Sequence, residues 1–570
     1  MNKKLKLYDV KKFSSIKEML SIAVNDVPDK VLYRYKTNVK INQATGFVLA
    51  EKTYREFYNE TRYIGTALAK HGCIGKKHVA CIGENTYKWI CAYLSTLAGN
   101  NVFVPIDKEL PFDDILNVLG RSESTAVFCS DKYEKLLRLN KEKIPSVKLF
   151  VCFDLKNHDG NYLSYDRLYE EGKALLESGY NGYVNSQSNE NELKMLVYTS
   201  GTTGNSKGVM LSEHNLCSCV YYGLQVSTIY DVGLSVLPFH HTYESVCGLL
   251  VGIHWHSTLC INDSLRSTLA NFKVYRPMYI YLVPALAEMF HKRIWRTVKE
   301  QGKTNQLKLL IKISNALRRM GIDLRRKFFS SIHETFGGRL VKIVCGGAPI
   351  RPEVGEFFED IGISLVNGYG ITECSPLVSA NREEFNSFNT AGLKLPCVDV
   401  KIESPDEFGN GEICVKGDTV MLGYYKDKAQ TEAVLKNGWF YTGDFGNVNA
   451  YGQITITGRK KNIIVLDNGK NIYPEELEDY IMSIPYVTEV VVYATSDENG
   501  NQSGLCAEAF LDEEKLVDLK IDDASKKLKD DIFVALKDLP IYKQVTRVVL
   551  RKIEFEKTTS KKIKRAVLKH

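Results

Sequence analysis

Residues 198–208 read Y-T-S-G-T-T-G-N-S-K-G, and the interpretation of the chain starts from this stretch. The apolar residues at 196–198 and 209–211 predict a strand on each side of a glycine-rich loop. Gly201 and Gly204 allow positive φ and a close approach of the backbone to a ligand. Hydrogen-bond donors suited to a polyphosphate come from Thr199, Ser200, Thr202, Thr203 and Lys207. A simple turn between strands would explain the glycines but not this set of donors.

The residues before this loop predict alternating helices and strands. Thr53 and Glu56 form a capping-box pattern at the start of a helix. Buried strands are expected at 78–82, 102–105 and 125–129, with helices at 87–97 and after Pro111. Such alternation is typical of parallel α/β layers. We therefore predict an α/β fold whose large N-terminal domain has layered α/β sheets and a β-rich subdomain.

The chain changes character after Gly458. Short strands are expected at 463–466, 490–494 and 504–511, together with helices at 474–482 and 521–536. This pattern predicts a small, mobile α+β domain. We expect an N-terminal domain at 1–457, a hinge at 458–461 and a C-terminal domain at 462–570.

The bulk composition limits the range of functions. The 570 residues carry a formal charge of only +7, which argues against nucleic acid as a partner but suits anionic ligands. The 14 cysteines include no C-x-x-C pair, and most stand in apolar runs, as expected of free thiols in the cytoplasm. No signal peptide is recognised at the N-terminus, and no run of about 20 apolar residues predicts a membrane span.

The loop at 198–208 closely resembles the phosphate-binding loop of the adenylate-forming superfamily, which includes acyl-CoA synthetases, adenylation domains and firefly luciferases. Further motifs recur in the family's order along the chain. They are C-G-G-A-P at 345–349, N-G-Y-G-I-T-E at 367–373, Y-T-G-D at 441–444, G-R-K-K-N-I-I at 458–464 and F-E-K-T-T-S-K-K-I-K-R at 555–565. The resemblance spans about Thr53 to Arg565, nearly the whole chain.

The resemblance implies an ATP site. Its expected residues are Thr199, Ser200, Gly201, Thr202, Thr203, Gly204, Lys207, Gly347, Ala348, Pro349, Asn367, Gly368, Tyr369, Gly370, Thr372, Asp444 and Arg459. Asp444 would accept both ribose hydroxyls, with Arg459 beside it. Mg²⁺ is the expected cofactor, bound by Glu373 with help from Thr202, because Mg²⁺ prefers few protein oxygens together with phosphates.

The C-terminal motif implies a catalytic lysine. The alignment favours Lys562, but Lys561 is an alternative because Glu556 and Lys561 stand where the family usually has Pro and Gly. The hinge would be Lys461. The loop carrying Gly469, Lys470 and Asn471 resembles the one that approaches the thiol arm of CoA.

L-P-F-H-H-T-Y-E at 237–244 resembles the long-chain acyl-CoA synthetase form L-P-x-x-H-x-x-E. This places His241, rather than His240, beside the acyl carbonyl, although a structural role is open for either histidine. Lys207, His241, Glu373 and Lys562 are thus the expected catalytic residues.

We therefore predict an ATP-dependent acid–CoA ligase that acts on medium- to long-chain fatty acids. The acid and ATP would give acyl-AMP and pyrophosphate, and CoA would then take the acyl group. One alternative is a ligase that loads an acyl carrier protein, whose phosphopantetheine arm presents the same thiol. Another is a non-catalytic ligand sensor on the same fold, which the retained Glu373, Asp444 and Arg459 make less attractive.

One segment, from Glu288 to Lys327, is strongly basic. It has twelve basic and three acidic residues, a net charge of +9. Within it, Leu307, Leu310, Ile311, Ser314 and Leu317 follow the spacing of an amphipathic helix. The basic side chains could face an anionic membrane on its cytoplasmic side, or they could simply be solvated.

Overall fold

The structure is a computed structural model that describes residues 6–41, 44–199, 206–465, 471–496, 502–557 and 563–565. It is described for the backbone alone at 38–41, 44–46, 471, 496 and 502–503. Internal contacts divide the chain into two units. The first contains residues 1–399, 415–440 and 451–453, and the second 400–414, 441–450 and 454–570. The predicted hinge at 458–461 stays a prediction.

An eight-stranded sheet forms the first layer of the first unit, with strand order β19-β9-β8-β4-β3-β5-β6-β7. Its strands are β3 (His78–Ile82), β4 (Val102–Pro105), β5 (Ala126–Cys129), β6 (Leu149–Cys152), β7 (Tyr162–Ser164), β8 (Leu193–Thr199), β9 (Lys207–Ser212) and β19 (Gly423–Tyr424). The strands from β8 to β7 are parallel, whereas β9 is antiparallel to β8 and β19 to β9. The predicted parallel α/β layer is confirmed.

A nine-stranded sheet forms the second layer, with strand order β16-β15-β14-β13-β12-β10-β11-β1-β2. Its strands are β1 (Val31–Ile41), β2 (Ala44–Thr53), β10 (Val232–Ser235), β11 (Thr258–Ile261), β12 (Tyr279–Leu282), β13 (Lys342–Cys345), β14 (Ser364–Gly370), β15 (Leu377–Ala380) and β16 (Leu393–Lys394). The six strands from β14 to β1 are parallel. Their carboxyl ends therefore lie along one edge, where open α/β sheets bind ligands.

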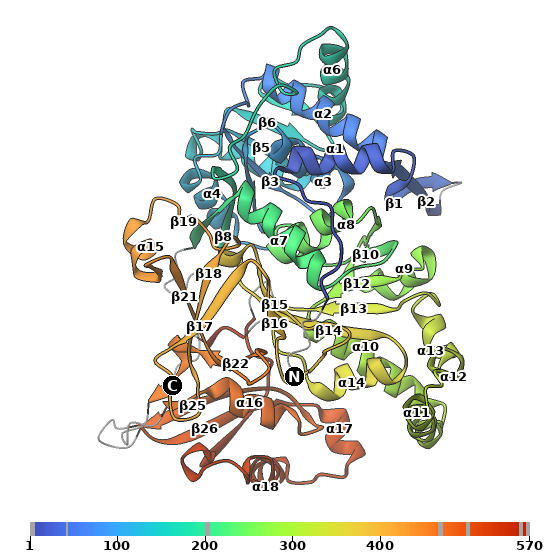
Figure 1. Cartoon of the computed structure of the whole chain (residues 1–570), viewed down its shortest axis with the longest axis vertical. Helices are drawn as coiled ribbons and strands as arrows, with labels where there is room; N and C mark the ends of the chain where they lie inside the picture. Colours follow the sequence, from blue (N-terminus) through green and yellow to red (C-terminus); the bar gives the residue numbers. More distant parts are fainter. Residues whose placement is uncertain are drawn as a thin grey trace. The chain divides into compact units, whose positions relative to one another are not determined.

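Helices pack against both sheets (Figure 1). They include α1 (Ile16–Asp26), α2 (Tyr54–Lys70), α3 (Tyr87–Ala98), α4 (Phe112–Arg121), α5 (Asp131–Leu139), α6 (Tyr165–Glu177), α7 (Glu213–Val226), α8 (Val251–His254), α9 (Thr268–Tyr275) and α15 (Lys428–Val434). The capping box predicted at the start of α2 is confirmed. Helix α7 contacts β8 and β9 of one sheet and β15 of the other, so it ties the two layers together.

Helix α6 lies directly on α2 because it carries a glycine at the contact. A Cβ at Gly172 would stand 1.8 Å from the carbonyl oxygen of Tyr63, on α2. This is far inside van der Waals distance, so only glycine allows the two helix backbones to approach this closely.

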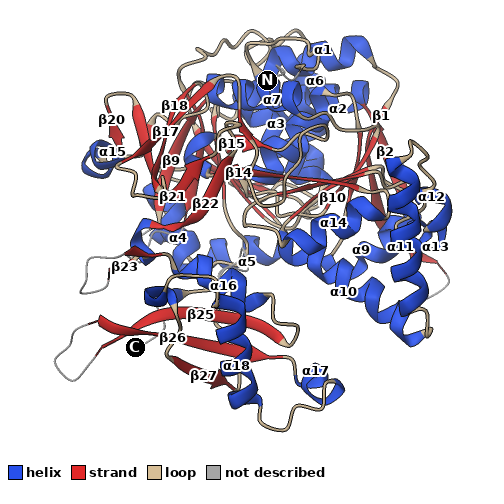
Figure 2. Cartoon of the chain, turned by 60° about the horizontal axis from the view of Figure 1, so that its bottom comes forward, coloured by secondary structure: helices blue, strands red, loops and turns tan. Residues whose placement is uncertain are grey.

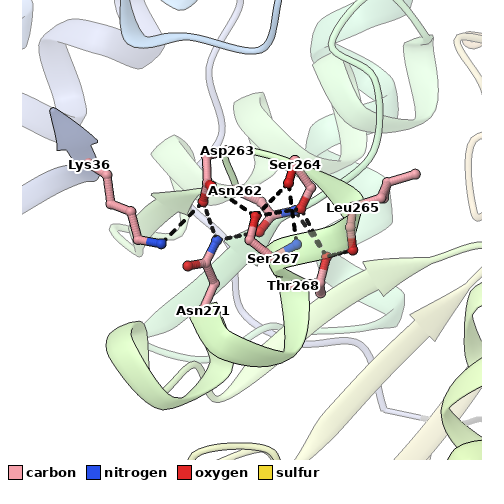
Figure 3. A network of polar contacts seen from close by, with 8 residues as sticks. All are labelled: Lys36, Asn262, Asp263, Ser264, Leu265, Ser267, Thr268 and Asn271. Carbon is pink, nitrogen blue, oxygen red and sulfur yellow. Dashed lines mark hydrogen bonds and ion pairs between the residues drawn. The ribbon is translucent and has the colours of Figure 1, made fainter. Parts of the chain in front are cut away.

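The polar residues after β11 are connected to one another by hydrogen bonds and to β1 by an ion pair (Figure 3). Asp263 pairs with Lys36 of β1 and accepts a hydrogen bond from Ser267, 2.8 Å away. The Asn271 amide donates to both Asn262 and Asp263. These contacts fix the start of α9 on the carboxyl end of β11 and on β1, so we assign them a structural role.

The basic segment folds into helices that lie together in the first unit (Figure 2). They are α10 (Pro284–Glu300), α11 (Thr304–Arg319) and α12 (Arg325–Phe328), and α13 (Ser330–Thr335) follows them. Helices α10 and α11 contact α14 (Pro352–Asp360). Of the predicted stripe on α11, Leu307 and Ser314 are buried. The amphipathic helix is confirmed.

The second unit has its own core. Strands β25 (Val487–Ser496), β26 (Gln502–Leu511) and β27 (Arg547–Arg551) form a sheet, against which α16 (Pro474–Met482) and α18 (Ala524–Leu536) pack (Figure 2). The unit also contains β22 (Ile454–Arg459), β23 (Ile464–Val465), β24 (Asn471–Ile472) and α17 (Glu513–Asp518), and most of β17 (Val398–Glu403), β18 (Gly411–Gly417) and β21 (Trp439–Val448). The predicted α+β character of the C-terminal region is confirmed.

Among the described residues, no helix is long and apolar enough to cross a membrane.

Candidate active site

The predicted phosphate loop joins two paired strands. Strands β8 and β9 are antiparallel, and Thr199 stands opposite Lys207 at the end of the ladder. The predicted strands on both sides of the loop are thus confirmed. The remaining loop residues of the prediction, Ser200, Gly201, Thr202, Thr203 and Gly204, lie outside the described residues.

Lys207 and Glu373 are brought together by Tyr424, a residue that the sequence did not single out. The Tyr424 hydroxyl donates a hydrogen bond of 2.9 Å to Oε1 of Glu373. The same ring has the Lys207 ammonium 4.9 Å from its centroid, within the range of a cation–π contact. Burial and the nearby Glu373 raise the pKa of Tyr424, so the phenol remains a donor at neutral pH.

The predicted adenine-binding segments follow β13 and end β14. Gly347, Ala348 and Pro349 are exposed just beyond β13, and Gly347 has φ +88°, which suits glycine. At Gly370 a Cβ would stand 2.3 Å from the carbonyl oxygen of Pro376, so glycine is required where β14 meets the next strand.

Asn367 is engaged within the fold. Its Nδ2 donates to the carbonyl of Thr390 at 2.8 Å, and its Oδ1 accepts from Asn381 Nδ2 at 2.8 Å. The side chain therefore holds the end of β14 in place. In the same motif Gly368 and Tyr369 lie on β14, and Thr372 begins the short 3₁₀ helix η4 (Thr372–Cys374), which carries Glu373.

The two adjacent histidines follow β10 at the same edge of the nine-stranded sheet. His240 Nε2 lies 3.5 Å from Oδ1 of Asp107, which follows β4 in the other sheet. Burial, and next the neighbouring His241, lower the pKa of His240 to about 3. The imidazole of His240 is therefore neutral at physiological pH. The contact with Asp107 gives His240 a structural role.

Two further residues fix the histidine segment. Asn85 Nδ2 donates to the Leu237 carbonyl at 2.7 Å, and Phe239 N donates to Asn85 Oδ1 at 3.1 Å. After His241 the chain enters a π-helix, η2 (Tyr243–Leu250), where the Tyr243 hydroxyl donates to the Val344 carbonyl at 2.9 Å. This contact connects the histidine segment to β13, directly before the C-G-G-A-P motif.

The last residue of the histidine motif, Glu244, is buried in the π-helix. It accepts a hydrogen bond from the Ser235 hydroxyl, and burial raises its pKa to about 8. Glu244 is therefore largely protonated at neutral pH and is part of the buried core.

The predicted ribose-binding pair is found in the second unit. Asp444 and Arg459 stand opposite each other on β21 and β22, and Arg459 Nε lies 2.9 Å from Asp444 Oδ1. The Asp444 side chain is buried and that of Arg459 is half-exposed. The next residue, Lys460, pairs with Glu412 at 2.6 Å, so a second ion pair connects the end of β22 to β18. The two residues that the resemblance assigns to the ribose thus form an ion pair, and their contact with a ribose stays a prediction.

The predicted hinge and transfer residues are only partly described. Lys461 lies in the short 3₁₀ helix η5 (Lys460–Asn462). Gly469, Lys470, Lys561 and Lys562 lie outside the described residues, and Asn471 is described for its backbone alone, at the start of β24.

The chemistry of the described residues fits a magnesium ion. Glu373 supplies a hard carboxylate oxygen, and Tyr424 holds its other side. Among the described residues, no cluster of three or more His, Cys, Asp or Glu forms a protein-only metal cage. A single carboxylate that shares Mg²⁺ with substrate phosphates and water is the usual arrangement for this ion.

Sequence reasoning missed three residues of this site: Tyr424, Asn85 and Tyr243. Tyr243 stands inside the quoted L-P-F-H-H-T-Y-E motif, so the motif gave a signal for it. Tyr424 and Asn85 belong to stretches without a motif. Their partners are 51 and 152 residues away along the chain, and such contacts appear only in the fold.

Comparisons with known proteins agree with this geometry. A family model described as AMP-binding enzyme matches residues 25–425, and the chain belongs to this family. It is 29% identical over 480 residues to the "Long-chain-fatty-acid--CoA ligase 6" of Rattus norvegicus, covering 78% of this chain and 68% of that protein. It is 30% identical over 482 residues to the "Long chain acyl-CoA synthetase 7, peroxisomal" of Arabidopsis thaliana, covering 78% and 67%.

Solved structures share the fold. The anthranilate CoA ligase AuaEII in complex with anthranoyl-AMP superposes with a TM-score of 0.75 at 17% identity, covering 99% of this chain and 97% of that one. The fold class predicted from the sequence is thereby confirmed.

Proposed function

We propose that this chain is an ATP-dependent fatty acid–CoA ligase. It forms acyl-AMP and pyrophosphate from the acid and ATP, and then acyl-CoA and AMP. The observation that carries the proposal is the joining of Lys207 and Glu373 through Tyr424, beside the hairpin that carries the phosphate-loop sequence. The names of the rat and Arabidopsis relatives support a fatty acid as the substrate and CoA as the acceptor.

Each site residue has its own role in adenylation. The acid carboxylate and the α-phosphate are both anionic, so cations must be in place before they meet. Lys207 would bind phosphate oxygens, Glu373 with Thr202 would hold Mg²⁺, and His241 would lie beside the acyl carbonyl. Bound Mg²⁺ would screen the negative charge of the phosphates. Asp444 and Arg459 hold the ribose, and Lys562 bridges the carboxylate and the α-phosphate.

The thiol acceptor follows in the second half-reaction. In our proposal the C-terminal domain turns about Lys461, so that Lys562 leaves the site and the loop with Gly469, Lys470 and Asn471 approaches the pantetheine arm of CoA. An acyl carrier protein presents the same arm and is the second candidate acceptor.

Pyrophosphate release tests the reaction. Purified protein is given ATP, Mg²⁺ and saturated fatty acids of increasing length, each with CoA, with an acyl carrier protein or with neither. Turnover with CoA and a medium- or long-chain acid supports the proposal. Turnover only with the carrier protein would identify a carrier-loading ligase. ATP or acid binding without any pyrophosphate would identify a ligand sensor.

The exposed face of α11 supports a peripheral contact with an anionic membrane as the source of the insoluble acid. Leu309, Ile313 and Met320 are exposed by 58%, 42% and 74% and fall on one side of the helix. By the same helical geometry Lys308, Lys312 and Arg319 form a basic row next to them. An apolar row flanked by cations is typical of helices that lie at a membrane surface.

Arg325 and Arg326, which the sequence placed on the same basic face, are instead tied into the fold. Arg325 pairs with Asp323 at 2.7 Å, and Arg326 donates to the carbonyls of Leu340 and Gly338. They are therefore unsuitable for testing membrane contact.

Vesicle co-sedimentation tests the contact. Each cation near an anionic surface contributes about 1 kcal/mol, so the Lys308→Gln, Lys312→Gln, Arg319→Gln triple variant should lose most of its binding. Binding should require anionic lipid and weaken with salt. The matched control is the Lys76→Gln, Lys135→Gln, Lys428→Gln variant, which also removes three exposed cations, from other parts of the chain. Equal binding to neutral vesicles, or no loss of binding in the triple variant, would contradict the membrane contact. The basic row would then be a solvated helix face.

A further inference from the structure

Tyr424 is the last residue of β19, the edge strand of the eight-stranded sheet, and its ring and its hydroxyl contact two different functional groups. The hydroxyl donates to Glu373, which follows β14 of the nine-stranded sheet, at 2.9 Å. The ring faces the ammonium of Lys207, which begins β9 of the eight-stranded sheet, at 4.9 Å. A single buried side chain thus connects the proposed metal carboxylate with the proposed phosphate cation.

The backbone of Tyr424 is fixed relative to Lys207. In β19, Gly423 and Tyr424 pair with Met210 and Val209 of β9. Just beyond, Tyr425 N donates to the Gly208 carbonyl at 2.7 Å. Because Gly208 follows Lys207 directly, the ring of Tyr424 is placed by the strand that carries the lysine.

The same segment also holds the residues around Glu373. Met421 N donates to the carbonyl oxygen of Glu373 at 2.9 Å, and the Ser375 hydroxyl donates to the carbonyl of Thr419 at 2.9 Å. Residues 419–424 therefore run alongside η4, and the phenol reaches Oε1 from a fixed direction. Its side chain is 6% exposed, so water competes little for this hydrogen bond.

A hydrogen bond to one oxygen of a carboxylate sets the rotation of the whole group. With Oε1 held by the phenol, the orientation of the Glu373 carboxylate is restricted. Outer partners of this kind orient metal ligands, and their loss typically weakens metal binding about 10–100-fold.

We propose that Tyr424 is a positioning residue that orients Glu373 towards the metal of Mg²⁺·ATP while its ring places Lys207 on the phosphate side. The inference rests on the proposed function for the identity of the ligand. It adds to that function a residue outside the motifs that the sequence carries.

The test compares Tyr424→Phe with Tyr425→Phe. The first variant keeps the ring near Lys207 and removes the hydrogen bond to Glu373. The second removes a phenol of equal size from the next residue, where it donates to Glu123 at 2.9 Å instead. ATP binding is measured by calorimetry in MgCl₂ and in EDTA, without acid or CoA, so the result does not depend on catalysis.

We expect Tyr424→Phe to weaken ATP binding about 10–100-fold in MgCl₂ and to leave it unchanged in EDTA. Tyr425→Phe should match the wild type under both conditions. Wild-type-like binding by Tyr424→Phe in MgCl₂ would overturn the inference. So would an equal loss in MgCl₂ and EDTA, because the tyrosine would then support the fold rather than the metal ligand.

A double-mutant cycle guards against a general packing defect. If Tyr424 acts through Glu373, Tyr424→Phe should have no further effect on Mg²⁺·ATP binding in a Glu373→Gln protein. Additive losses would refute the connection. A third variant, Tyr424→Leu, also removes the ring and should weaken ATP binding in EDTA by at least about two- to fivefold, because a buried cation–π contact is no weaker than an exposed one.

The result for Tyr424 can be told apart from the result for the ligase reaction. If the wild type binds Mg²⁺·ATP but releases no pyrophosphate with any acid, the ligase proposal fails while the role of Tyr424 is still decided by the binding data.

Discussion

Replacing His240 by glutamine should make the protein less sensitive to acid. His240 is 11% exposed and lies 3.5 Å from Asp107, and its pKa falls from 6.5 to about 3, chiefly because the ring is buried. Other charged groups that act on it are His241 and Lys108. Below pH 6.5 the unfolded chain binds a proton that the folded chain does not, so stability falls as the pH falls.

The size of the effect follows from the two pKa values. Each pH unit below 6.5 costs about 1.4 kcal/mol, until the pH reaches the folded pKa. Between pH 7.5 and 5 the wild type should therefore lose about 2 kcal/mol of stability through His240 alone. Gln places an amide nitrogen near the position of Nε2 and does not titrate, so His240→Gln should lack this loss.

Urea unfolding at pH 7.5 and 5, followed by tryptophan fluorescence, measures the difference. Trp89 is a local reporter because its ring lies 5.3 Å from that of Phe239, next to His240. His214→Gln, at a half-buried histidine, controls for the loss of an imidazole as such. Equal pH dependence in the wild type and His240→Gln would show that His240 is not the buried neutral group described above. Strong loss of adenylation in His240→Gln, with little in His241→Gln, would reverse the assignment of the two histidines.

Three further predictions concern the half-reactions. Lys562→Ala should lower acyl-adenylate formation about 10²–10⁴-fold while sparing thioester formation from supplied acyl-AMP, and a larger defect in Lys561→Ala would move the catalytic position by one residue. Lys461→Pro should fix φ and leave adenylation intact while CoA transfer is lost, whereas equal loss of both half-reactions would place the hinge elsewhere. Asp444→Asn should raise the KM for ATP about 10–100-fold, because hydrogen bonds to a charged group are each worth about 1.5–3 kcal/mol, and an unchanged KM would contradict its ribose contact.

Much of the fold could be predicted because the local signals were strong. The capping box of Thr53 and Glu56, the strands on both sides of the phosphate loop and the helix at 474–482 appear where the sequence placed them. In each case a single segment carries its own pattern of apolar spacing, caps or breakers. The order of the strands within each sheet could not be predicted in this way. Neighbours such as β1 and β11 are brought together by packing, and no local sequence pattern indicates their pairing.

The basic segment shows where sequence patterns are insufficient. From the sequence alone, Arg325 and Arg326 were expected to be as free to face a membrane or solvent as Lys308 and Lys312. In the structure Arg325 pairs with the neighbouring Asp323 and donates to the Glu359 carbonyl, and Arg326 donates to the carbonyls of Leu340 and Gly338. The two lysines are exposed on α11. A side chain's charge is visible in the sequence, but the partner that neutralises it is fixed by tertiary structure.

The same reasoning explains which site residues a motif can reveal. Motifs preserve residues that meet the ligand, and these cluster because one loop or one strand end presents them together. The residues that position them make their contacts far along the chain, even where one of them, Tyr243, stands inside a motif. Tyr424 reaches Glu373 across 51 residues, Tyr243 reaches Val344 across 101, and Asn85 reaches Leu237 across 152. Each makes its contact through one polar group at the end of a strand or loop. Since a misplaced carboxylate or histidine loses much of its catalytic value, such distant contacts should influence activity as strongly as several of the motif positions.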